Sequence, residues 1–88
     1  MMENKVLVKL ILPELDTSFD VFIPVNEITW KVKKLLAKAV SDLCNVHTYQ
    51  NLDFILLNKD NSKIYDNNTI IIDSDIRNGT ELLLISKM

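Results

Sequence analysis

The sequence predicts one α+β domain, spanning residues 1–88, in which a single helix packs on one face of a mixed β-sheet. Two observations lead to this fold class. Segments near both ends of the chain carry apolar side chains at every second position, and one central segment carries them at helical spacing. Turn-forming residues separate these segments, and 88 residues leave room for one core.

The first two predicted strands, residues 5–12 and 17–25, form an antiparallel hairpin around a turn at residues 13–16. One face of the first strand is made of Val6, Val8, Leu10 and Leu12. One face of the second strand is made of Phe19, Val21 and Ile23. Both strands therefore have an apolar side suited to a core.

A helix is predicted from Asn26 to about Leu43. Asn26 is a favourable N-cap, Glu27 adds acidic charge to the first turn, and Asn45 is a stop signal. One apolar stripe should face the sheet, and it consists of Ile28, Val32, Leu35, Leu36, Ala39, Val40 and Leu43.

The rest of the chain predicts three more strands. Residues 52–57 form the third strand, and the turn chemistry of residues 58–61 leads into a short fourth strand at 62–65. Residues 70–72 are a short apolar run of undetermined type. The Asn78-Gly79 turn signal precedes a last strand at 80–85, so the element order is β-β-α-β-β-β.

That order, with these spacings, resembles ubiquitin-like (β-grasp) domains over essentially the whole chain. The most specific stretch, residues 73–85, looks like the loop and last strand of that superfamily, with Ile76 as the apolar anchor. Within the superfamily the chain is similar to the YukD/EsaB-like proteins of type VII secretion systems in Gram-positive bacteria. The points of likeness are residues 19–24 (Phe-Asp-Val-Phe-Ile-Pro), the basic helix with Val32 and Leu35-Leu36, and residues 76–82.

The resemblance implies a cytoplasmic accessory or regulatory protein beside a membrane-embedded secretion machine, and not an enzyme. Conjugated modifiers and sulfur carriers of the superfamily need a terminal Gly-Gly. This sequence ends Ile85-Ser86-Lys87-Met88 and has its only glycine at Gly79. A modifier or sulfur-carrier role would therefore require a longer native tail.

The sequence offers little for chemistry. Cys44, the only cysteine, allows no internal disulfide and no zinc site of cysteines, which suits the cytosol. It is expected to be a half-buried packing residue, and His47, the only histidine, a surface-loop residue rather than its catalytic partner. One glycine cannot build a phosphate-cradling loop. We expect no cofactor, no metal and no catalysis.

Charge and hydropathy exclude other classes of partner. The formal net charge is −2, and the basic residues are spread along the chain, unlike the basic footprint of a nucleic-acid-binding protein. No apolar stretch approaches the roughly 20 residues of a membrane span, and no signal peptide is evident. Any association with a membrane is expected to come through a protein partner.

The sheet supplies the main candidate for a protein-binding surface. If one face of each strand meets the helix, period two directs six apolar side chains to the other face: Leu7, Ile11, Ile55, Leu57, Leu83 and Ile85. In the ubiquitin-like arrangement the first, third and last strands are central neighbours, so these residues are expected to form one contiguous patch. The alternative is that the chain's own tail and loops cover part of it.

A weaker candidate is the helix face around Trp30, Lys33 and Lys34, where an exposed tryptophan beside cations would be a binding hot spot. Trp30 could equally fold over the start of the helix or pack on a loop. The expected function is protein binding to cytoplasmic parts of a secretion complex. The main rival is a stand-alone ubiquitin-like subunit that self-associates, as a homodimer, through the sheet patch.

Overall fold

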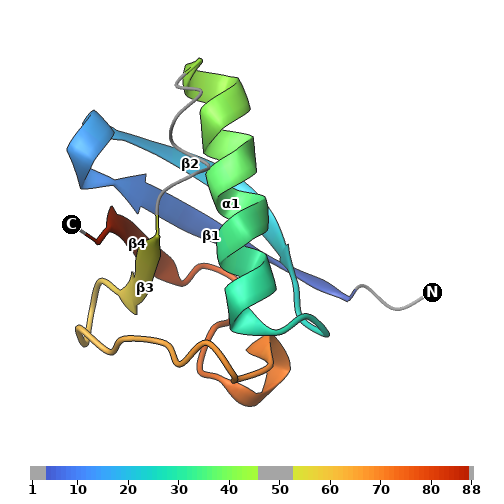
Figure 1. The fold of residues 1–88 in the computed structure, drawn as a ribbon. Coiled ribbons are helices and arrows are strands. Elements are labelled where there is room, and N and C mark those ends of the chain that lie inside the picture. The colour runs from blue at the N-terminus through green and yellow to red at the C-terminus, as the bar shows by residue number, and fades with distance from the viewer. Residues whose placement is uncertain (1–3, 46–52, 88) are drawn as a thin grey trace.

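The computed structural model describes residues 4–45 and 53–87, and within them one α-helix crosses one face of a four-stranded sheet (Figure 1). The strands are β1 (Lys5–Leu12), β2 (Thr17–Pro24), β3 (Phe54–Asn58) and β4 (Glu81–Ser86). The helix α1 spans Thr29–Cys44, and two short 3-10 helices, η1 (Pro13–Leu15) and η3 (Ile71–Asp73), lie in the connections.

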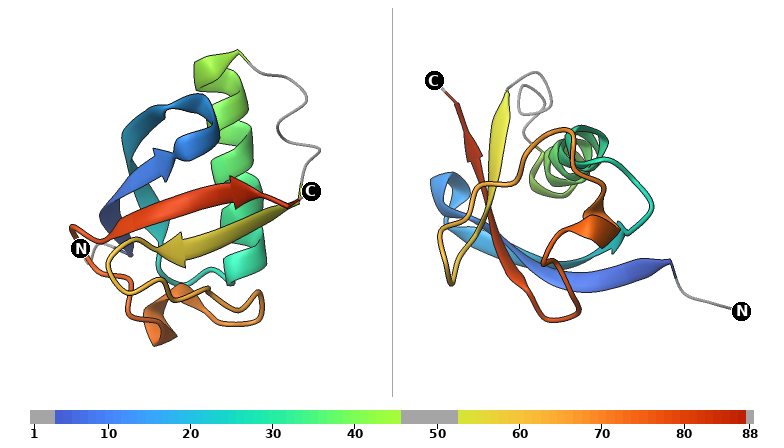
Figure 2. Two further views of the ribbon diagram at one scale, coloured as in Figure 1. Left: turned by 90° about the vertical axis from the view of Figure 1, so that its left-hand side faces the viewer. Right: turned by 90° about the horizontal axis from the view of Figure 1, so that it is seen from below.

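The strand order is β2-β1-β4-β3. β1 pairs antiparallel with β2, and β3 pairs antiparallel with β4, whereas the central pair β1 and β4 is parallel. The first, last and third strands are therefore neighbours, as the resemblance to ubiquitin-like domains implied, but β3 lies at the edge of the described sheet rather than in its middle. Figure 2 (left) shows the sheet in front of α1, so one face of the sheet meets the helix and the other is not covered by it.

The core lies between α1 and the sheet, and the period-two pattern predicts its strand residues correctly. Seven inward side chains of β1, β3 and β4 are at most 3% exposed: Val8, Leu10, Leu12, Phe54, Leu56, Leu82 and Leu84. Ile23 of β2 is fully buried, while Val6, Phe19 and Val21 pack half-buried against this core. Ile76, the predicted anchor before the last strand, is 1% exposed.

The helix begins two residues later than predicted, and Asn26 does not cap it. Its N-cap is Ile28, which makes no side-chain capping bond. The first backbone N–H groups instead donate to loop carbonyls, from Thr29 to Thr69 at 2.9 Å and from Trp30 to Asn67 at 3.2 Å. A distant segment satisfies the orphan donors of the first turn, so a local capping side chain is unnecessary. The predicted stop is confirmed, because Asn45 adopts the left-handed conformation and its N–H donates to Ser41.

The buried face of α1 is rotated from the predicted stripe. Leu35 and Leu43, which were expected to face the sheet, are 53% and 62% exposed. The residues that are buried include two hydroxyl side chains and an alanine: Thr29, Val32, Leu36, Ala37, Val40 and Ser41. Thr29 can face inward because its hydroxyl donates to the Thr69 carbonyl at 2.6 Å. A hydropathy pattern alone places such residues outside.

The predicted short strand at 62–65 is wrong, because the structure has only an isolated bridge there, between Leu57 and Ile64. Ser62 is in the left-handed conformation, and after Ile64 the chain turns inward at Tyr65, which is 4% exposed. The run at 70–72 leads into η3 and pairs with the loop before α1, where Ile70 forms a bridge with Ile28.

Candidate protein-binding surface

The face of the sheet that α1 leaves uncovered, here called the open face, carries a cluster of aliphatic side chains. Direct Cα partners on neighbouring strands point to the same side of a sheet. Ile11 of β1 is paired with Leu83 of β4, and Leu83 with Leu57 of β3, so the three form a continuous row. Ile85 and Ile55 form the next row, one pleat further along the same strands. These five residues are the apolar cluster.

The apolar cluster is half-buried rather than fully exposed, since all five members have intermediate accessibility. Ile64, at the isolated bridge beside Leu57, extends the first row and is 62% exposed. Sequence reasoning missed Ile64, because it assigned that segment to a strand without a register relative to β3.

Leu7 does not belong to this cluster, although the sequence predicted one contiguous patch of six residues. Its partner on β2 is Phe22, and both lie on the open face with exposures of 40% and 65%. Two residues along β1, between Leu7 and Ile11, stands Lys9. The alternation in β2 already placed Phe22 on this face, so its exposure was within reach of sequence reasoning.

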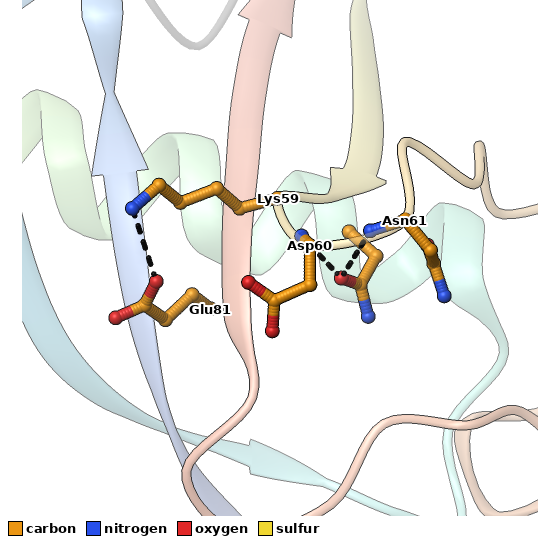
Figure 3. Close-up of polar contacts among 5 residues, drawn as sticks. Lys59, Asp60, Asn61 and Glu81 are labelled. Atoms are coloured by element: carbon orange, nitrogen blue, oxygen red, sulfur yellow. Dashed lines mark hydrogen bonds and ion pairs between the residues drawn. The ribbon is translucent and has the colours of Figure 1, made fainter.

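The separation is made by a row of four charged residues, the charged row, which crosses the sheet between the two apolar regions. Lys9 is the Cα partner of both Asp20 and Glu81. Lys59, directly after β3, continues the row, since its backbone N–H donates to the Glu81 carbonyl at 3.0 Å. Its ammonium lies 3.3 Å from Glu81 Oε1, and its side chain runs across β4 (Figure 3).

The charged row also shapes the open face. A hollow of about 340 Å³ lies on the hairpin side of Lys9 and is lined by Ile11, Ser18 and Lys59 among others. A second hollow of about 480 Å³ lies on the other side, beside Leu7 and Gly79. The open face is therefore uneven. Apolar residues lie on both sides of the charged row, and the two hollows leave room for protruding side chains of a partner.

A tight turn fixes the Lys59 end of the charged row. Asn58 Oδ1 accepts from the backbone N–H groups of Asp60 at 2.8 Å and Asn61 at 3.4 Å (Figure 3). Asn58 Nδ2 donates to the Tyr65 hydroxyl at 3.1 Å, and that hydroxyl donates to Asp75 Oδ1 at 2.5 Å. Burial, and then this bond to Asp75, raises the pKa of Tyr65 to about 12. The bond from Tyr65 lowers the pKa of Asp75.

The three residues predicted on the helix face have different surroundings and do not form one binding site. Trp30 is 40% exposed, and the cation over its ring is Lys31, with Nζ 5.7 Å from the ring centroid. Lys33 points to β3 instead and donates to the Phe54 carbonyl at 2.7 Å. Burial lowers the pKa of Lys33, against the opposing effect of the Asp53 carboxylate. Lys34 is exposed.

The residues considered for catalysis or metal binding form no such site in the part of the chain that the structure describes. Cys44 is half-buried at the end of α1 and packs against the core. His47 lies outside the described residues. Among residues 4–45 and 53–87, no three His, Cys, Asp or Glu side chains gather as they would around a metal ion. In the same ranges, α1 is neither long nor apolar enough to cross a membrane.

Comparison with solved structures identifies the architecture. The N-terminal ubiquitin-like domain of the 4931431F19Rik protein superposes with a TM-score of 0.67 at 15% identity, covering 99% of this chain and 79% of that one. The fold is the ubiquitin-like β-grasp. A de novo design based on ubiquitin gives the same TM-score at 13% identity. No protein-family model and no curated protein matches the sequence.

Two further matches come from large assemblies. A chain of the MycP5-free ESX-5 inner membrane complex matches with a TM-score of 0.67 at 12% identity. The match covers 97% of this chain but only 21% of that one, so this protein resembles one part of a much longer polypeptide. A chain of the toluene 4-monooxygenase HD complex matches at 0.69 and 10% identity, covering 94% of this chain and 99% of that one.

Proposed function

We propose that this protein is a non-catalytic accessory or regulatory component of a type VII secretion system, located in the cytoplasm, and that it binds another protein through the open face. The observation that carries the proposal is the apolar cluster on β1, β4 and β3, which α1 does not cover. Apolar side chains on both sides of central strands are typical of a sheet whose second face meets a partner.

The secretion context is supported by a resemblance in sequence and is compatible with a likeness in fold. The sequence resembles YukD/EsaB-like proteins in residues 19–24 and 76–82, and the fold matches part of a chain in an ESX-5 inner membrane complex. The toluene monooxygenase match shows that the same fold occurs in an unrelated assembly, so the fold does not choose the partner. The sequence resemblance is what favours secretion over other accessory roles.

The open face is favoured over the helix face by its composition. The apolar cluster is continuous over three paired strands, and the neighbouring hollow beside Gly79 can receive a side chain. On α1, by contrast, Lys31 and Lys38 are occupied by ion pairs with Glu27 and Asp42. Lys33 bonds to the sheet. The helix face therefore offers a tryptophan with few free cations.

The test is an affinity capture from cytoplasm and solubilised membranes of the host, with secretion-complex components quantified by mass spectrometry. Leu83→Asp and Ile55→Asp place a charge in the apolar cluster and should abolish capture. Leu35→Asp is the matched control, since Leu35 is 53% exposed on α1 and far from the open face. Circular dichroism must show each variant folded.

Equal recovery of secretion components by a folded Leu83→Asp variant and by wild type would refute the open face as the docking site. Loss of capture by Leu35→Asp alone would move the site to the helix. Recovery of no secretion component by wild type would refute the secretion context.

A further inference from the structure

The charged row has a symmetry that restricts what can bind on top of it. Across β2, β1, β4 and the residue after β3, the four charges alternate in sign: Asp20, Lys9, Glu81, Lys59. Reversing the order of the row gives the opposite sequence of signs. The row is therefore antisymmetric about its midpoint, which lies between Lys9 and Glu81.

This antisymmetry makes the row complementary to itself. Consider a second copy related by a two-fold axis that runs parallel to the central strands, in the plane between the two sheets and directly above the midpoint. The rotation places β1 of one copy over β4 of the other, so that Lys9 faces Glu81 of the second copy. Asp20 then faces Lys59 of the second copy. Each of the four charges meets an opposite charge, in addition to its neighbours within its own sheet.

Three apolar residues, Ile11, Leu83 and Leu7, find suitable positions under the same operation, whereas Leu57 lies over Ser18 of the second copy. Ile11 and Leu83 are Cα partners on the two central strands, so each lies over the other in the second copy. Leu7 is bonded at its carbonyl to the N–H of Gly79 at 2.8 Å, which places the two side by side on either side of the axis. Leu7 of one copy therefore faces Gly79 of the other, where the 480 Å³ hollow lies and where no atom comes within 4 Å of a Cβ position.

We infer that the open face binds a second copy of this chain in a two-fold symmetric dimer, with the sheets packed face to face. Any partner that covers the apolar cluster also covers the charged row, and charges removed from water cost free energy unless opposite charges compensate them. The ion pair between Lys59 and Glu81 compensates part of that cost. A partner with the same alternation in reverse adds further compensation, and a second copy presents it without further adaptation. A standard interface of about 800 Å² per partner would take only a small part of the 5600 Å² surface of the chain.

This inference rests on the proposed function in one respect, namely that the open face is the binding surface. It differs in naming the occupant. One chain cannot place the same face against a second copy and against a secretion component at once, so dimerisation and docking would compete.

The test uses two variants of the full chain with opposite charge patterns. Lys9→Glu/Lys59→Glu makes the row wholly acidic, and Asp20→Lys/Glu81→Lys makes it wholly basic. Each variant alone should be monomeric at concentrations where wild type is dimeric, because facing like charges weaken association by roughly 100-fold or more. An equimolar mixture should form a 1:1 heterodimer, which native mass spectrometry resolves by mass.

Lys38→Glu is the matched control, since it reverses an exposed charge on α1 outside both candidate surfaces and should leave the wild-type dimer unchanged. A second measurement needs no variant. Carbodiimide coupling of a mixture of ¹⁴N- and ¹⁵N-labelled wild type should yield mixed-isotope products that join Lys9 to Glu81. Sedimentation in increasing salt should show the dimer weakening, as expected for exposed charge pairs.

The inference is overturned if wild type stays monomeric at several hundred micromolar, if the two folded variants do not pair, or if either variant dimerises as wild type does. The two proposals fail separately. A monomeric wild type whose capture of secretion components is lost in Leu83→Asp would refute only the dimer. A two-fold dimer that captures no secretion component would refute only the secretion role.

Discussion

Replacing Tyr65 by phenylalanine tests whether a buried hydroxyl holds the segment after β3 to the loop before β4. The ring is 4% exposed, so Tyr65→Phe keeps the packing and removes only the hydroxyl. Two hydrogen bonds disappear, the donation to Asp75 Oδ1 at 2.5 Å and the acceptance from Asn58 Nδ2 at 3.1 Å.

The expected loss of unfolding free energy is about 2 kcal/mol at pH 7. A neutral hydrogen bond contributes about 1 kcal/mol and one to a charged group about 1.5–3 kcal/mol. The lower end applies to Asp75, because water reaches its exposed carboxylate once the hydroxyl is gone. For a domain of this size the melting temperature should fall by roughly 10 °C.

The difference between wild type and Tyr65→Phe should depend on pH at both ends of the scale. The bond from Tyr65 lowers the pKa of Asp75 in the folded state. The stabilisation is therefore complete above the unfolded pKa of about 4 and is lost as pH falls through the lower folded value. The pKa of Tyr65 is raised to about 12. Wild type should therefore lose stability as pH rises above about 10, and the variant should not.

Urea unfolding followed by circular dichroism, at several pH values between 3 and 11, measures this difference. A double-mutant cycle with Asp75→Ala should give a coupling energy of about 1 kcal/mol. A difference below about 0.5 kcal/mol at pH 7 would contradict the assigned role of the hydroxyl, because that is the range of an uninvolved surface substitution. A difference that stays constant from pH 3 to pH 7 would contradict the role of the carboxylate.

Two further substitutions test the segment that leads into β4. Ile76→Ala should lower the unfolding free energy by about 3 kcal/mol, because Ile76 is 1% exposed and its removal leaves a cavity; a loss under 1 kcal/mol in urea unfolding would show that the anchor is dispensable. Gly79→Ala should cost about 1 kcal/mol, because Gly79 has φ 88° while a Cβ would meet no atom within 4 Å. A melting temperature equal to that of wild type would show that this backbone conformation is not required.

The faces of the strands could be predicted from the sequence because apolar and polar positions alternate along each strand. Val8 and Leu10, Leu56, and Leu82 and Leu84 share their faces by alternation and were assumed to meet the helix, and all are at most 1% exposed. The stop at Asn45 is equally local, since it depends on one residue that tolerates the left-handed conformation. Such signals need no knowledge of the rest of the chain.

The helix shows where local signals end. The start of α1 is set by carbonyls of residues 67 and 69, far away in the sequence, so the favourable capping residue Asn26 is not used. Thr29 occupies the buried face because the Thr69 carbonyl receives its hydroxyl, while Leu35 is turned outward. A pattern of hydropathy cannot foresee a polar side chain whose partner comes from elsewhere in the fold.

For the candidate surface, too, some features follow from the local sequence and others depend on how distant strands pair. Alternation places Leu7 and Leu83 on one face of the sheet, and the structure agrees. It does not say which residues of different strands share a row, because that depends on the register of pairing. Alternation along β1 already places Lys9 between Leu7 and Ile11, and the register adds Asp20 and Glu81 beside Lys9. Together these charges separate a patch that the sequence predicted to be continuous.

The register also changes the requirement that a partner must meet. A continuous apolar patch would accept any apolar surface of similar shape, and its specificity would be low. A charged row between two apolar regions rejects a purely apolar partner, since Lys9 and Asp20 would lose water without gaining an opposite charge. The open face should therefore select partners by the order of their charges, and variants that reverse single charges in this row should weaken binding more than variants that shorten Phe22 or Leu7.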